Sequence, residues 1–266
     1  MILQRLIAGI VLLFLAAVAS THAAERSTEA SPFIFSASAL APTPSRGWVV
    51  LLPGEDELAF KTNAAHYEKI AALLNANGFD TLIVPYEEAY DEDVDGEPES
   101  EGERIAAVTA RAVHWMHQAH PSTEGDPGVV VTWAEGAQGL AVLAATGGAY
   151  PLPNLVAAVA FYPDFSEAAP FSSRLPLLVQ MGAADEGLRA LRRYLDAREP
   201  GSVEPDVVIQ EDAKHAFDVE RFAKPKTVRS TPLIGETVTF AYNAAAAHAA
   251  QQKMLTFLKA RLEAPE

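Results

Sequence analysis

Cysteine is absent from the 266-residue sequence, and basic side chains are scarce. The first absence excludes disulfides, thiolate metal sites and a cysteine nucleophile. The second leaves 20 Lys and Arg against 35 Asp and Glu, a net charge of −15, with no long basic run. Because neutralising phosphates requires clustered cations, we do not expect nucleic acid as a partner.

Apolar runs are short except near the start, where Leu6 to Ala19 is uninterrupted and small residues follow up to Ala24. As a helix this run would measure about 21 Å, short of the roughly 30 Å hydrocarbon core of a membrane, so a membrane anchor is the weaker alternative. The layout is typical of a secretory signal peptide. We therefore predict a signal peptide over residues 1–23 and a periplasmic or secreted protein, detached from the membrane once the peptide is cleaved.

The rest of the chain has ample material for a hydrophobic core. Hydrophobic residues make up 49% of the sequence and charged residues 21%, which favours a globular protein over a disordered one. Residues 24–45 are rich in Ser, Ala, Thr and Pro, and this composition predicts an irregular lead-in. Since no repeat or linker divides residues 46–266, we expect them to form a single domain.

From Gly47 onward, short continuous apolar runs alternate with longer amphipathic ones. Strands that are apolar throughout are buried on both faces, as in a mostly parallel sheet flanked by helices on both faces. The predicted strands are residues 48–52, 81–84, 129–132, 156–161, 177–180 and 207–210. The predicted helices are residues 62–77, 101–119, 135–146, 186–198 and 243–262. The expected fold class is therefore α/β.

Ten acidic residues and no basic residue lie between Glu87 and Glu103, which predicts a solvated surface loop because like charges repel. Within this segment, residues 91–96 (Asp-Glu-Asp-Val-Asp-Gly) imitate the opening of an EF-hand calcium loop. The bidentate Glu that would close such a loop is replaced by Gly102, and Pro98 interrupts its second half. An acidic, calcium-responsive surface stays open as an alternative. We expect no other metal site and no cofactor.

Three strand ends carry the residues of interest, since ligands of an open parallel sheet bind beyond the carboxyl ends of its strands. The strand at 129–132 leads through a tight turn at Ala134 into a helix, and later strands lead to Asp185 and to His215. The order turn, Asp, His, with separations of 51 and 30 residues, is that of the α/β-hydrolase triad. In such a triad the imidazole takes the proton of a nucleophile at the turn, and the carboxylate orients the imidazole.

The motifs around these positions resemble those of the dienelactone hydrolase family. They are residues 133–137 (Trp-Ala-Glu-Gly-Ala), 182–185 (Gly-Ala-Ala-Asp), 215–218 (His-Ala-Phe-Asp) and 242–247 (Tyr-Asn-Ala-Ala-Ala-Ala), within a resemblance that spans most of residues 47–262. It implies an α/β-hydrolase fold and hydrolysis of a small-molecule ester or lactone through an acyl-enzyme. It also implies His215 as the base and Asp185 as the group that orients it. The implied oxyanion hole consists of backbone N–H groups of Glu135 and of Gly54 or Glu55.

The sequence departs from this family where the chemistry would begin. The family places Cys or Ser at the apex of the turn, whereas this chain has Ala134, whose methyl group cannot attack a carbonyl. Thr132 replaces the usual Gly two positions earlier, and Pro53-Gly54 stands where related hydrolases often have His-Gly. Several departures together favour natural loss over a single engineered replacement.

We therefore expect the fold and pocket to be retained and catalysis to be lost or severely weakened, so that the protein binds a small molecule or a protein partner. One alternative is an active ester or lactone hydrolase in which His215 activates water or another hydroxyl. Another is the acidic, calcium-responsive protein. For single residues, structural alternatives also stand: Asp185 as a helix cap, and Glu135 as a favourable charge in the first turn of a helix.

Overall fold

The computed structural model describes residues 31–40, 45–145, 148–166, 168, 170, 172–173, 175–229 and 237–262. The chain divides into a unit of residues 1–31 and a unit of residues 32–266, and the helices and strands named below belong to the second. The predicted signal peptide lies outside the described residues. Among the described helices, none combines the length and the apolar character that crossing a membrane requires.

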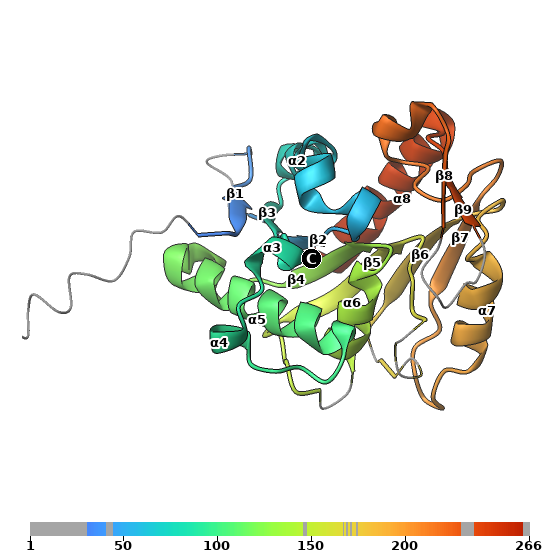
Figure 1. Cartoon of the computed structure of the whole chain (residues 1–266). Helices are drawn as coiled ribbons and strands as arrows, with labels where there is room; N and C mark the ends of the chain where they lie inside the picture. Colours follow the sequence, from blue (N-terminus) through green and yellow to red (C-terminus); the bar gives the residue numbers. More distant parts are fainter. Residues whose placement is uncertain are drawn as a thin grey trace, which may run out of the picture. The chain divides into compact units, whose positions relative to one another are not determined.

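Seven strands form the main sheet of the described chain, in the order β1-β3-β2-β4-β5-β6-β7 (Figure 1). They are β1 (Ile34–Ser36), β2 (Trp48–Leu52), β3 (Asp80–Ile83), β4 (Gly128–Trp133), β5 (Leu155–Phe161), β6 (Leu177–Gly182) and β7 (Asp206–Gln210). β1 is antiparallel to β3, and the other pairs are parallel. All residues of β2, β4 and β6 are buried, because helices cover the sheet on both faces.

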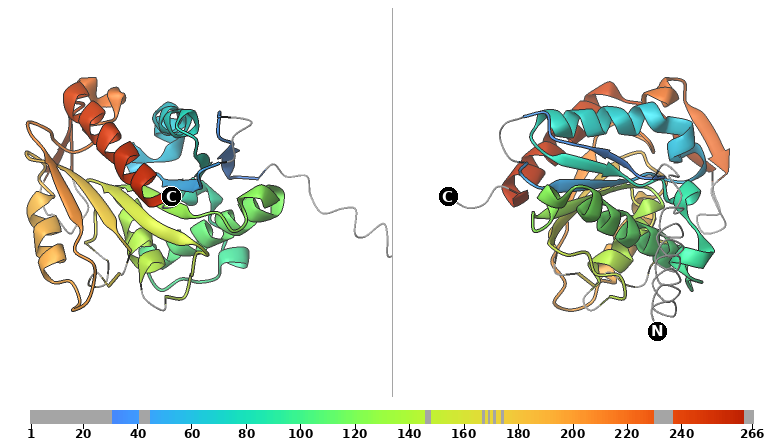
Figure 2. Two further views of the ribbon diagram at one scale, coloured as in Figure 1. Left: turned by 180° about the vertical axis from the view of Figure 1, so that it is seen from behind. Right: turned by 90° about the vertical axis from the view of Figure 1, so that its left-hand side faces the viewer.

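The long helices form two layers. α2 (Phe60–Ala76) and α8 (Ala244–Leu262) lie on one face of the sheet, and α5 (Glu101–Ala119), α6 (Gly136–Ala144) and α7 (Leu188–Asp196) lie on the other (Figure 2). Capping side chains set where α5 and α8 begin. Ser100 Oγ accepts the Glu103 N–H at 3.2 Å, and Asn243 Oδ1 accepts the N–H groups of Ala245 and Ala246 at 3.1 Å. The predicted α/β architecture, with helices on both faces of a mostly parallel sheet, is confirmed.

The structure differs from the prediction at the edges of the fold. β1 lies inside the expected irregular lead-in, where Ile34 to Ser36 pair with β3. β8 (Lys226–Arg229) and β9 (Thr237–Phe240) form a separate antiparallel pair, and neither strand is among those predicted from the sequence. Both features are only three or four residues per strand, too short for an apolar pattern to stand out.

The acidic segment is more ordered than the expected solvated loop. It contains α3 (Tyr86–Ala89) and α4 (Glu92–Asp95). The Asp95 side chain is 2% exposed and accepts hydrogen bonds from Arg111 of α5, at 2.7 Å from Nε and 2.9 Å from Nη2. Asp91 accepts the Asp93 N–H at 3.1 Å as the N-cap of α4. These carboxylates therefore serve the helix and its neighbour, and in the described chain no group of three or more His, Cys, Asp or Glu side chains is arranged to hold a metal ion.

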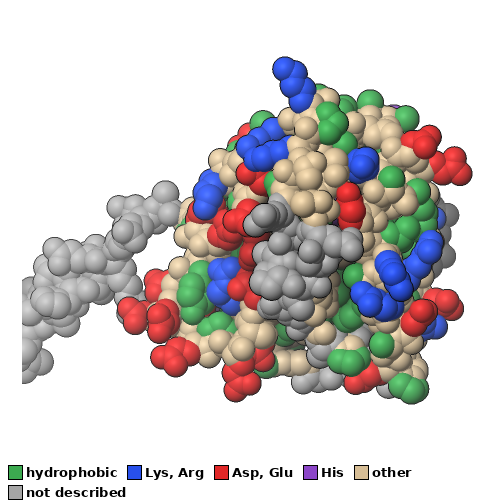
Figure 3. Space-filling model, turned by 45° about the vertical axis from the view of Figure 1, so that its right-hand side comes forward, with side chains coloured by type: hydrophobic (Ala, Val, Ile, Leu, Met, Phe, Trp, Pro, Cys, Tyr) green, Lys and Arg blue, Asp and Glu red, His purple; other side chains and the backbone are tan. Residues whose placement is uncertain are grey.

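On one face of the molecule, basic side chains are intermixed with acidic and neutral ones. On the face shown in Figure 3, Lys and Arg side chains lie in small groups among acidic and neutral ones, and the described residues of that face form no continuous basic surface.

Candidate active site

β4 ends in a sharp turn whose apex is Ala134. Its φ of 44° lies in the left-handed region that non-glycine residues rarely adopt, and the residue is 1% exposed. The Ala134 N–H donates to the Phe161 carbonyl at 3.1 Å, and the Ala134 carbonyl accepts the Asp164 N–H at 2.9 Å. A Cβ on Gly136, the first residue of α6, would lie 2.8 Å from the Pro53 carbonyl oxygen. This is the strained strand-turn-helix geometry of a nucleophile elbow, with a methyl group at its apex.

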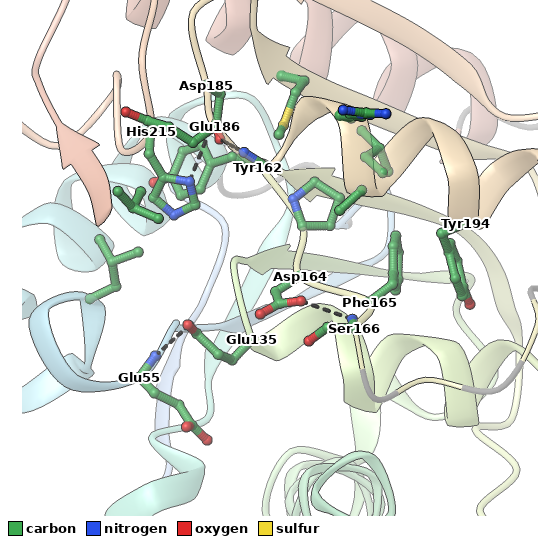
Figure 4. Close-up of a pocket in the computed structure, with 18 of the residues that line it drawn as sticks. Glu55, Glu135, Tyr162, Asp164, Phe165, Ser166, Asp185, Glu186, Tyr194 and His215 are labelled. Carbon is green, nitrogen blue, oxygen red and sulfur yellow. Dashed lines mark hydrogen bonds and ion pairs between the residues drawn. The ribbon is translucent and has the colours of Figure 1, made fainter. Parts of the chain in front are cut away.

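Asp185 and His215 come together from the loops after β6 and β7. His215 Nδ1 lies 2.9 Å from Asp185 Oδ2 (Figure 4). The other oxygen of Asp185 accepts the Gly187 N–H at 2.7 Å, and α7 begins only at Leu188. One carboxylate thus orients the imidazole and also fixes the turn before α7. The alternative that Asp185 serves as a helix cap therefore describes only part of what the side chain does.

A buried carboxylate that the sequence analysis assigned no role connects the elbow to His215. Asp218 is 3% exposed and accepts hydrogen bonds from Trp133 Nε1 at 2.9 Å and from the Tyr162 hydroxyl at 2.8 Å. The Tyr162 ring lies 4.5 Å from the His215 ring between centroids, and Phe240 of β9 stacks on the same imidazole at 5.0 Å. Asp218 therefore holds Trp133, the residue before Ala134, and Tyr162, whose ring packs against His215.

The expected oxyanion hole is occupied by a side chain of the protein itself. The Glu55 N–H donates to Glu135 Oε2 at 3.1 Å (Figure 4). The backbone N–H of Glu135 itself favours the charged form of this carboxyl group. The Gly54 N–H donates elsewhere, to the Tyr67 hydroxyl at 3.2 Å, so Glu55 is the member of the Gly54 or Glu55 alternative that faces the elbow. One of the two donors expected for an oxyanion is thus paired with the Glu135 side chain, and the other is the backbone N–H of Glu135 itself.

The electrostatics of the site follow from this crowding of carboxylates. Burial raises the pKa of the Glu135 carboxyl above its ordinary value, although the two N–H donors and the His215 imidazole favour its charged form. For His215, burial disfavours the charged ring, but the charge and hydrogen bond of Asp185, followed by the carboxylates of Glu135 and Asp164, raise its pKa overall. Neighbouring negative charge therefore outweighs desolvation at the imidazole.

Glu55 also forms an acidic pair with Glu101 of α5. Burial, a hydrogen bond with Glu101 and the charge of Glu101 raise the pKa of Glu55 to about 8, against the influence of Arg104. Arg104 Nη2 lies 3.3 Å from Glu55 Oε1, and its guanidinium stands 5.6 Å from the centre of the Tyr86 ring. Glu55 is thus largely protonated at neutral pH, which limits the negative charge on this side of the site.

A cavity of about 630 Å³ opens beside the dyad. Phe165 and Tyr194 stack with ring centroids 4.5 Å apart on one side of it, and the polar groups that line it include Glu135, Asp164 and His215. The lining thus combines aromatic surface with many charged and polar side chains, and a concave site of this size beside the dyad can receive a small molecule.

The hydroxyl groups of Thr132, Ser166 and Ser173 are poorly placed to replace the missing nucleophile. Thr132, fully buried in β4, and Ser173, 2% exposed, are both enclosed by the fold. Ser166 lines the cavity but lies apart from His215 (Figure 4).

Asp164 was not predicted from the sequence as a site residue. It follows β5 at the same edge of the sheet as the other site residues, and this position could have indicated it. The direction of the Glu135 side chain could not have been predicted, since it depends on the packed loop after β2.

Known proteins support the family likeness and the fold. Residues 136–262 match the model described as the dienelactone hydrolase family. No curated protein sequence matches the chain. Two solved structures with a TM-score of 0.57 and 15% identity are similar: esterase 2 of Thermogutta terrifontis phosphorylated by paraoxon, covering 88% of this chain and 90% of that chain, and the dienelactone hydrolase of Anabaena variabilis, covering 87% and 92%.

A third similar structure is P91, a dienelactone hydrolase-like promiscuous phosphotriesterase from metagenomic libraries. It has a TM-score of 0.59 and 17% identity, and the alignment covers 86% of this chain and 92% of that chain. At such identities the likeness shows the fold alone. Residues 136–262, which contain Asp185 and His215, are thus similar to the dienelactone hydrolase family, and the chain has the fold of the α/β hydrolases.

Proposed function

We propose that this protein binds a small ester-like or lactone-like molecule in the cavity beside His215 and does not turn it over through an acyl-enzyme. The observation that carries the proposal is the methyl group of Ala134 at the apex of an otherwise retained elbow. Acyl transfer needs an oxygen or sulfur nucleophile at that point, and an alkyl group offers no electron pair. The intact Asp185 to His215 contact and the cavity support a site that still receives ligands.

The ligand class follows from the lining of the cavity and from the likeness to esterases. Phe165, Tyr194 and Phe240 offer apolar surface, and the volume of about 630 Å³ suits a compact organic molecule. One of the similar structures is a Thermogutta terrifontis esterase with propionate bound, which is a statement about that protein. For this chain it supports short acyl compounds as the first candidates to test.

The experiment uses the native chain with an activated ester such as p-nitrophenyl acetate, and with stable lactam analogues of small lactones as ligands. We expect no saturable burst of p-nitrophenol, because nothing at the apex can be acylated. We expect at least one lactam to raise the melting temperature through saturable binding. Ala190→Trp places a large side chain in the cavity lining and should abolish binding, whereas Ala249→Trp on the exposed face of α8 should not. A burst in the native protein, or binding unaffected by Ala190→Trp, would contradict the proposal.

A second candidate is hydrolysis by a water molecule that His215 activates, and the 2.9 Å contact between His215 and Asp185 favours it. This activity would give steady turnover without a burst. General-base catalysis contributes about 10²–10⁴-fold, so His215→Ala should reduce the rate by a similar factor if the candidate is right. A weak rate that His215→Ala leaves unchanged would exclude it.

We also propose that the protein acts outside the cytoplasm after removal of residues 1–23. The apolar run from Leu6 to Ala19 and the small residues after it support this proposal.

A further inference from the structure

The Glu135 carboxyl group accepts a hydrogen bond from a backbone N–H that was expected to bind the oxyanion of a hydrolase reaction. Its Oε2 accepts the Glu55 N–H at 3.1 Å, and the backbone N–H of Glu135 favours the charged form of the same carboxyl group. These two N–H groups belong to the loop after β2 and to the residue after the elbow, which are the two elements from which such a hole is built. The Glu55 donor is therefore already paired with an oxygen of the protein.

The carboxyl group and one of the two N–H donors belong to the same residue. Glu135 supplies one of the two N–H donors, so its carboxylate is always within reach and competes with any incoming oxygen as an intramolecular ligand. Its charged form also has the sign that the hole is suited to bind, because aligned N–H donors favour anions. A carbonyl oxygen, which is neutral and arrives from solution, has neither advantage.

We propose that Glu135 is a built-in occupant of the oxyanion hole, and that it closes the hole to carbonyl and carboxylate oxygens of ligands. The inference goes beyond the proposed function but rests on the same elbow geometry. The absence of a nucleophile and the filled hole are then two separate obstacles to acyl transfer. Restoring a hydroxyl with Ala134→Ser removes only the first of them.

The first test compares Ala134→Ser, Glu135→Ala and the double variant with p-nitrophenyl acetate. In the step tested, the introduced hydroxyl oxygen bonds to the acyl carbon, His215 takes the hydroxyl proton, and p-nitrophenolate leaves with the electron pair of the broken ester bond. Loss of one oxyanion-hole donor costs about 10²–10³-fold in rate. We therefore expect the double variant to be acylated about 10²-fold or more faster than Ala134→Ser. Glu135→Ala alone should show no burst.

The matched control replaces Glu135 with Gln in the Ala134→Ser background. Gln keeps an oxygen of the same reach but carries no charge, so it should keep the hole filled and gain little rate. A second control, Asp164→Asn, removes a neighbouring negative charge and leaves the Glu135 carboxylate in place. If the gain came from reduced repulsion of the ester rather than from opening the hole, both controls would show it as strongly as Glu135→Ala.

The second test needs no catalysis and uses acetate as the probe. In Glu135→Ala, the amide resonance of Glu55 should move upfield because its acceptor is gone, and it should return downfield as acetate binds saturably. In the native protein, acetate should leave this resonance unchanged. This measurement decides the case if the Ala134→Ser variants prove inert.

Two results would overturn the inference. One is acylation of Ala134→Ser as fast as that of the double variant, and the other is a Glu135→Ala protein whose Glu55 amide neither shifts nor responds to acetate. Neither result would touch the proposed function, which concerns ligand binding by the native chain. Conversely, an acyl burst in the native protein would contradict the proposed function and leave the acetate test of Glu135 intact.

Discussion

The residues around the dyad carry an unusual amount of backbone strain. Ala134, Tyr162 and Ala216 have φ angles of 44°, 35° and 55°, all in the left-handed region. For residues other than glycine such conformations cost about 1–3 kcal/mol each, and they persist only where surrounding structure imposes them. Here two backbone hydrogen bonds hold Ala134, and Asp218 holds the Tyr162 side chain. The elbow geometry is thus enforced by its neighbours and does not depend on the side chain at the apex.

Glu55 gives a prediction about pH. Its pKa is raised from 4.5 to about 8, so the folded state holds the proton more tightly than the unfolded state. The stability that this group contributes is fully present below pH about 4.5 and is lost as pH rises through about 8. Glu55→Gln imitates the protonated carboxyl and should remove this loss. Thermal unfolding between pH 5 and 9 should therefore show a smaller decline in Tm for the variant than for the native chain.

Glu99→Gln is the matched control for Glu55, because Glu99 is an exposed carboxyl on the loop before α5. Its Tm profile should follow that of the native protein over the same range. If the Glu55→Gln profile also runs parallel to the native one, the proton held at Glu55 has no part in stability.

The positions of the site residues could be predicted better than their contacts. Ala134, Asp185 and His215 follow strands whose ends must meet at one edge of the sheet, so order along the chain was enough to bring them together. The partners of Glu135 and Asp218 depend on how side chains from separate loops pack, and no sequence pattern encodes that. Order along the chain therefore locates the site, whereas the packing of side chains decides whether the expected oxyanion hole is open to a ligand.

At the scale of the elements, α4 gives the acidic segment a part in the stability of the fold. Replacing a solvated loop would leave the stability of the fold unchanged. The Asp95 side chain, however, is 2% exposed and accepts two hydrogen bonds from Arg111 of α5. Hydrogen bonds to charged groups contribute about 1.5–3 kcal/mol. We expect Asp95→Asn to lower the free energy of unfolding by about 1–3 kcal/mol in urea titration, and replacement of residues 91–101 by a Gly/Ser linker to be destabilising as well.

Asp93→Asn provides the comparison, since Asp93 is exposed on the same helix. It should change stability by less than about 0.5 kcal/mol, as surface substitutions usually do. Equal effects of the two substitutions would contradict the role given to Asp95. A large rise in Tm on adding calcium to the native protein would show instead that these carboxylates bind a metal ion.

The long elements were predictable for a physical reason that does not extend to the short ones. Strands buried on both faces and helices of two or more turns leave continuous or periodic apolar patterns, as at β2, β4 and α5. β1 and the pair β8 and β9 are held by neighbours far along the chain. Phe240 of β9, for example, packs on His215. Tertiary contacts rather than local pattern place such strands.

For the whole molecule, the prediction concerns export. The described residues begin at 31, so the signal peptide over residues 1–23 stays a prediction from the sequence. Expression of the full chain in a bacterial host should yield a periplasmic or secreted form whose N-terminus, read by mass spectrometry, lies near Ala24 or Glu25. Recovery of intact chains beginning with Met1 in the membrane fraction would indicate an anchored protein.

The central claim is that the molecule keeps the hydrolase fold around an elbow that cannot form a covalent intermediate. The most direct measurement is the intact mass of the native chain after incubation with paraoxon, which phosphorylates the nucleophile of susceptible esterases. The double variant Ala134→Ser with Glu135→Ala serves as the reactive reference. The account predicts an unchanged mass for the native chain and one diethylphosphoryl adduct on the variant. A stoichiometric adduct on the native chain, mapped to a residue in the cavity, would contradict it.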